Sequence, residues 1–76
     1  MDISKIQKQL SNFASERDWE KFHSPKNLSM ALSVEASELV EIFQWLTLEE
    51  SNFPDQKQLA SIRSEVADIA MYLIRF

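Results

Sequence analysis

With 76 residues and no cysteine, the chain has room for one small domain, whose stability we expect to depend on oligomerisation or on a cation held by oxygen ligands, not on disulfides. Eight basic against twelve acidic residues give a net charge of −4, which disfavours binding to a nucleic-acid polymer. No apolar run approaches the roughly 20 residues that span a bilayer, and MDISKIQKQL lacks the apolar core of a secretory signal, so we expect a cytoplasmic protein without a membrane segment.

The first predicted helix covers residues 2–16. Ile3, Ile6, Leu10 and Phe13 recur at helical spacing, and the pattern fades in the polar stretch SERDWEKFHS. Trp19 lies in this stretch, and a large aromatic side chain in a connector needs somewhere to pack.

The second predicted helix begins with Ser24 as its N-cap and Pro25 at the first helical position, where the missing N–H of proline costs nothing. Its apolar stripe has steps of three and four and consists of Leu28, Leu32, Leu39, Ile42 and Leu46. Glu35 occupies the one remaining position of this stripe. A carboxylate therefore stands where a core residue is expected.

The third predicted helix begins near Asp55. Before it, Thr47 and Glu50 match a T-x-x-E capping box, and the residues around Pro54 form a turn or a second cap. The apolar stripe of the third helix continues through the last residue and consists of Leu59, Ile62, Val66, Ile69, Leu73 and Phe76. We therefore expect an all-α, antiparallel bundle with three helices in one domain, completed by a further helix or by a partner subunit.

Two pairs of acids have helical i, i+3 spacing: Glu35 with Glu38, and Glu65 with Asp68. If the second and third helices pack antiparallel, the pairs can converge, and four repelling carboxylates are tolerable there only with cations between them. Ligation by oxygen alone favours magnesium, manganese or calcium over zinc. The alternative is that each pair belongs to a solvated acidic face.

Three further side chains are candidates for ligand contacts. Trp45 lies two turns beyond Glu38 and Tyr72 one turn beyond Asp68, so the two aromatics could hold a base between them or could pack in a core or interface. His23 could contact a phosphate or cap the local backbone, and we favour the cap. Because the chain has no recognisable nucleophile, glycine-rich loop or zinc motif, hydrolysis would use metal-activated water.

The acidic motifs resemble those of a known family. Residues 35–38 match E-x-x-E and residues 65–68 match E-x-x-D, the signature of the MazG-like, all-α nucleoside triphosphate pyrophosphohydrolases. The stretch ERDWEKFHSPKNLSMALSVEASELVEIFQWL, residues 16–46, closely resembles the dCTP pyrophosphatase branch of this family. SEVADIAMYLIRF, at residues 64–76, resembles the helix that follows in that branch.

The resemblance implies a reaction and a site. Water would attack the α-phosphorus of a nucleoside triphosphate and release the monophosphate and pyrophosphate, which removes non-standard or excess nucleotides. The implied magnesium ligands, for which manganese could substitute, are Glu35, Glu38, Glu65 and Asp68, and Glu38 or Glu35 would orient the water. The implied pyrimidine contacts are Trp19, Trp45 and Tyr72, and the loop from Trp19 to His23 would line the nucleotide site. Family members assemble as dimers or tetramers in which neighbouring subunits complete the site.

Two departures from the family and two rival functions accompany this prediction. Vertebrate members of the branch have a histidine near the base where this chain has Leu10, so the resemblance does not fix the base preference. The family also continues into a helix with Lys, Asn and Arg residues near the phosphates, which would follow Phe76. The rival functions are a non-catalytic helical dimerisation module and a nucleotide or cation sensor without turnover.

Overall fold

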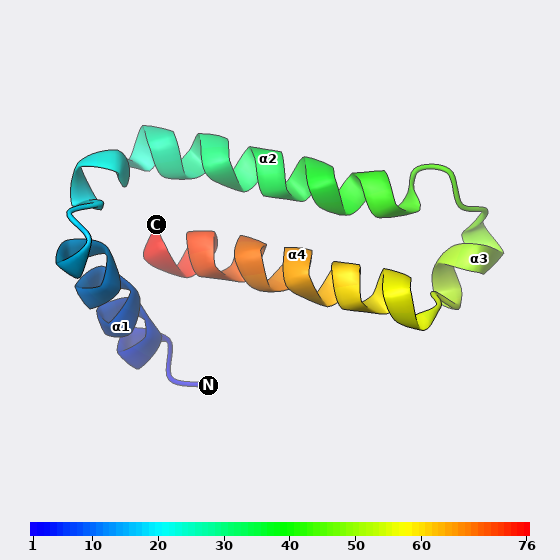
Figure 1. Ribbon diagram of the computed structural model, residues 1–76, viewed down its shortest axis with the longest axis horizontal. Helices are drawn as coiled ribbons and strands as arrows, with labels where there is room; N and C mark the ends of the chain where they lie inside the picture. Colours follow the sequence, from blue (N-terminus) through cyan, green and yellow to red (C-terminus); the bar gives the residue numbers. More distant parts are fainter.

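The computed structural model describes residues 1–76, and every regular element in it is helical. The elements in chain order are α1 (Ile3–Glu16), the short 3-10 helix η1 (Glu20–Phe22), α2 (Pro25–Phe43), α3 (Leu48–Asn52) and α4 (Gln56–Arg75). Figure 1 shows α2 and α4 side by side and antiparallel, with α3 at the closed end of this hairpin. Helix α1 packs against α4 near the other end, where the chain terminates. The predicted all-α, antiparallel arrangement is confirmed.

Side-chain caps define where α2 and α4 begin. Ser24 Oγ accepts a hydrogen bond from the Asn27 N–H at 3.1 Å, and proline follows at the first helical position. At the start of α4, Asp55 Oδ1 accepts from the Gln58 N–H at 2.7 Å, and Gln58 Oε1 accepts from the Asp55 N–H at 3.0 Å. Such caps satisfy N–H groups that have no partner within the helix. Both predicted starts are confirmed.

Two short elements complete the connections, and the sequence predicted only the cap of one of them. Helix α3 begins with the predicted capping box, in which the Thr47 N–H donates to Glu50 Oε1 at 2.8 Å and the Glu50 N–H donates to Thr47 Oγ1 at 3.1 Å. η1 forms a single turn in the connector before α2, where no helical period was visible. Leu46 lies beyond the end of α2 at Phe43, so the predicted stripe is longer than the helix.

Helix α1 ends in a turn in which Asp18 adopts the left-handed conformation, and this turn fixes the backbone of Trp19. Asp18 has a φ of 56°, a region in which aspartate is among the few tolerated residues other than glycine. The Trp19 N–H donates to the Ala14 carbonyl at 2.8 Å, and the Asp18 N–H donates to the Ser15 carbonyl at 3.1 Å. This pair of bonds is the Schellman motif, which satisfies carbonyls left free at a helix end. The first residue after the turn is therefore held against the last turn of α1.

The hairpin has little enclosed core. Only Ala14 and Leu28 are buried, whereas Trp45, Leu48 and Phe53 near the closed end of the hairpin are 88%, 89% and 79% exposed. The radius of gyration is 14.9 Å, compared with about 11 Å for a compact domain of 76 residues. No helix has the combination of length and apolarity that crossing a membrane requires. Much apolar surface of α2, α3 and α4 thus remains free for contact with another surface.

Candidate functional site

Three carboxylates converge between α2 and α4. Glu35 and Glu38 are one turn apart on α2, and Glu65 approaches them from α4, so that one carboxylate oxygen of each residue lies within 4.8 Å of the others. Glu35 and Glu65 are half-buried, while Glu38 is exposed. The antiparallel packing of α2 and α4 thus brings together three of the four predicted metal ligands.

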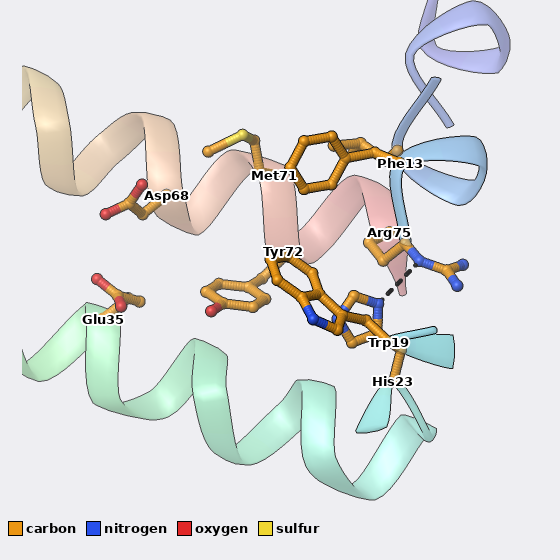
Figure 2. A pocket seen from close by; sticks show the side chains of 9 residues that line it. Phe13, Trp19, His23, Glu35, Asp68, Met71, Tyr72 and Arg75 are labelled. Carbon is orange, nitrogen blue, oxygen red and sulfur yellow. Dashed lines mark hydrogen bonds between the residues drawn. The ribbon is translucent and has the colours of Figure 1, made fainter. Parts of the chain in front are cut away.

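Asp68, the fourth predicted ligand, lies beside this cluster. It is one turn after Glu65 on α4 and lines the same pocket as Glu35. Figure 2 shows Asp68 and Glu35 facing each other from α4 and α2. The carboxylates therefore continue from the three-residue cluster into a pocket on one side of it.

The cluster is electrostatically unbalanced. Glu35 Oε2 and Glu65 Oε2 are inaccessible to solvent and have no hydrogen-bond partner. The adjacent Glu35 carboxyl raises the pKa of Glu65 to about 7, and loss of water and the negative charge of Glu38 act in the same direction. A hard cation would satisfy both orphaned oxygens and remove the repulsion, and these all-oxygen donors fit magnesium or manganese.

A pocket of about 260 Å³ opens between α1, the connector, α2 and α4 (Figure 2). Its volume is near the lower end of that of small-molecule sites, about 300–1,000 Å³. The lining residues are Leu10, Phe13, Trp19, His23, Glu35, Asp68, Met71, Tyr72 and Arg75. The pocket is thus acidic at one end and mainly aromatic and apolar elsewhere.

Aromatic contacts form one wall of the pocket. The rings of Phe13 and Trp19 meet edge to face, with centroids 5.5 Å apart and an interplanar angle of 66°. The guanidinium of Arg17 lies 3.5 Å from the centroid of the Phe13 ring and 5.7 Å from that of Trp19. Edge-to-face and cation–π contacts of this kind are attractive, so they favour one orientation of the indole. Trp19 therefore has its packing partners in the last turn of α1 and in its C-cap residue, six or fewer residues away along the chain.

A polar pair occupies the end of the pocket away from the carboxylates. Arg75 Nε, on the last turn of α4, donates a hydrogen bond to His23 Nδ1 at 3.2 Å, in a partly buried position (Figure 2). The His23 side chain thus bonds to Arg75 and lines the pocket, and it makes no hydrogen bond to the local backbone. The His23 N–H caps the end of η1 by donating to the Glu20 carbonyl, whereas the side chain does not take the local capping role that we favoured, because the packing of α4 brings Arg75 to the imidazole.

Two of the three predicted base contacts line the pocket and the third does not. Trp19, His23 and Tyr72 line the pocket, but Trp45 follows the C-terminal end of α2, is 88% exposed and does not line it. Sequence reasoning also missed Phe13, Met71 and Arg75 as lining residues. For Arg75 a signal existed, because Asp68 and Arg75 are seven residues apart and such residues share a helical face.

The chain is similar to several characterised proteins. It is 40% identical to dCTP pyrophosphatase 1 of Bos taurus over 74 residues, and 39% identical to dCTP pyrophosphatase 1 of Homo sapiens over 74 residues. Each alignment covers 95% of this chain and 44% of the relative, so the chain spans less than half the length of these curated relatives. No model of a known protein family matches the chain.

A solved structure shares the same fold over nearly the whole chain. The crystal structure of a pyrophosphatase from Archaeoglobus fulgidus superposes with a TM-score of 0.85 at 34% sequence identity. The match covers 95% of this chain and 68% of that protein. Sequence and architecture therefore agree on the same group of relatives.

Proposed function

Because the chain belongs to the MazG-like, all-α nucleoside triphosphate pyrophosphohydrolase family, we propose that it hydrolyses deoxynucleoside or nucleoside triphosphates to the monophosphate and pyrophosphate. Pyrimidine nucleotides such as dCTP are the first substrates to test, because the mammalian relatives are dCTP pyrophosphatases. The observation that carries the proposal is a three-carboxylate cluster that adjoins an aromatic pocket. Removal of non-standard or excess nucleotides is the corresponding role in the cell.

The two ends of the pocket suit the two ends of a nucleotide. Glu35, Glu38 and Glu65 would hold magnesium, with Asp68 beside them, and the triphosphate would bind at this end through the cation. Tyr72 and Trp19 would contact the base. On α4, Asp68 and Tyr72 are one turn apart, about 6 Å along the helix axis, which separates a phosphate end from a base end on one helical face.

The bound cation would neutralise the triphosphate and lower the pKa of a bound water. The oxygen of the water attacks the α-phosphorus, the bond from that phosphorus to the bridging oxygen breaks, and pyrophosphate leaves. We propose that Glu38, and not Glu35, orients the water and accepts its proton. Glu38 is exposed, whereas one oxygen of Glu35 is closed to solvent, and a base must reach the proton that it accepts.

We also propose that a second copy of the chain takes part. Trp45 cannot contact a base in the pocket of its own chain. The start of α2 lies beside His23 at the pocket, whereas Trp45 follows the opposite end of this helix, which has 19 residues and is about 28 Å long. A homodimer or homotetramer would cover the exposed apolar surface of the hairpin and could bring Trp45 to a neighbouring pocket.

Product analysis with magnesium and a panel of nucleotides tests the function. Glu38→Gln keeps the shape of the side chain but removes the charge, so we expect loss of pyrophosphate release without loss of helical content. Glu49→Gln, which removes an exposed charge on α3, is the control and should retain activity. Because the chain spans part of its relatives, the assay uses both this chain and its longest natural form.

The outcomes separate the rival functions. Nucleotide binding without release of pyrophosphate in either form indicates a sensor. Absence of both nucleotide and magnesium binding indicates a dimerisation module. Equal rates for Glu38→Gln and the parent would show that the carboxylate cluster is not the catalytic centre.

A further inference from the structure

The hydrogen bond between Arg75 and His23 determines which ring nitrogen of His23 carries a proton. Arg75 Nε is a permanent donor, and His23 Nδ1 is the atom that accepts from it. A neutral imidazole that accepts at Nδ1 must carry its hydrogen on Nε2. His23 bound to Arg75 is therefore a donor at its other nitrogen and not an acceptor.

This pair lies at the end of the pocket where the base is placed in the proposed function. Figure 2 shows Glu35 and Asp68 at one end, Trp19, His23 and Arg75 at the other, and Tyr72 between them. On α4, Asp68 and Arg75 are two turns apart, about 10 Å along the axis. The imidazole thus lies beyond Tyr72 as seen from the carboxylates, at the end of the pocket assigned to the base and away from the end assigned to the phosphates.

We propose that Arg75 is a positioning residue, which holds His23 as the Nε2–H tautomer so that His23 donates to a carbonyl oxygen of the bound base. The inference rests on the proposed function and adds a group that selects the base. Cytosine, thymine and guanine each carry a carbonyl oxygen, whereas adenine carries none. The pair is partly buried, which strengthens the hydrogen bond between Arg75 and His23 relative to a fully exposed one.

The geometry of the side chains supplies a matched pair of variants. Glutamine has its Nε2 donor the same number of bonds from Cα as Arg Nε, so Arg75→Gln can keep the bond to His23 without the charge. Arg75→Met has a similar unbranched stem and no donor. If Arg75 acts through the hydrogen bond, Arg75→Gln should resemble the parent and Arg75→Met should not.

The first measurement is nuclear magnetic resonance of the ¹⁵N-labelled imidazole in the ligand-free chain. His23 is the only histidine, so its two ring nitrogens are the only signals. We expect one neutral tautomer, Nε2–H, in the parent and in Arg75→Gln, and a mixture of both neutral tautomers in Arg75→Met. Equal tautomer populations in the parent and Arg75→Met would overturn the positioning role, independently of any nucleotide.

The second measurement compares two ligands in the presence of magnesium. We expect Arg75→Met to bind dCTP about tenfold more weakly than the parent, since a lost hydrogen bond that leaves a buried group unpaired costs about that factor in affinity. Inorganic tripolyphosphate has no base and should bind the parent and both variants equally. Equal loss for both ligands would place Arg75 at the phosphates and overturn the inference, as would unchanged dCTP affinity. If the parent binds neither ligand, the proposed function fails and base selection with it, while the tautomer result stands by itself.

Discussion

Magnesium should raise the melting temperature of the chain, because the folded protein holds Glu35, Glu38 and Glu65 close together and the unfolded chain does not. A ligand that binds only the folded state at ten times its dissociation constant stabilises it by about 1.4 kcal/mol. With about 2.1 cal/mol/K of unfolding entropy per residue and 76 residues, this free energy corresponds to a rise of about 9 °C. Melts followed by circular dichroism at increasing magnesium and fixed protein concentration measure the rise.

Two controls separate coordination from general screening of charge. Glu65→Gln removes a ligand with an orphaned oxygen and should reduce the rise to a small fraction, whereas Glu49→Gln removes an exposed charge on α3 and should leave the rise unchanged. Potassium chloride at matched ionic strength should give little or no rise. An unchanged melting temperature in the parent, or equal rises in both variants, would refute the cation site and favour a solvated acidic face.

Trp45→Ala should weaken nucleotide affinity, measured by calorimetric titration, about ten- to a hundredfold, which is the cost of one base stack. Unchanged affinity together with a changed oligomeric state would instead assign Trp45 to the interface. Without metal, the free energy of unfolding should decline as the pH rises from about 4.5 to about 7, because the raised pKa of Glu65 makes the folded state bind more protons than the unfolded state in this range. Denaturant titrations of Glu65→Gln at the same pH values should lack this decline. Thr47→Ala should cost about 1 kcal/mol in the same titrations, and no loss would mean that α3 does not contribute to the cooperative unit.

The helix boundaries could be predicted because they depend on neighbouring residues. Ser24, Thr47 and Asp55 each cap a helix through a residue three positions later, and a sequence displays this spacing directly. The convergence of Glu35 with Glu65 required one additional assumption, antiparallel packing of α2 and α4, which apolar stripes of similar length made reasonable.

The base end of the pocket could not be predicted in the same way. The bond between His23 and Arg75 joins residues 52 positions apart, and it depends on how α1 and the connector pack against the end of α4. Helical period identifies the face of α4 that carries Arg75 but not its partner across the interface. Trp45 shows the converse limit, since its helical face was extrapolated beyond the residue at which α2 ends.

Trp19, which follows the left-handed turn at Asp18, is part of both the end of α1 and the pocket wall. The Trp19 amide is bonded to the Ala14 carbonyl at the end of α1, while the Trp19 side chain lines the pocket. Fraying of the last turn of α1 and loss of this wall are therefore a single opening reaction. A ligand in contact with the indole must slow hydrogen exchange of the amides in that turn, and substitutions that promote fraying must weaken binding by the fraction of closed turn that they remove, without contacting the ligand.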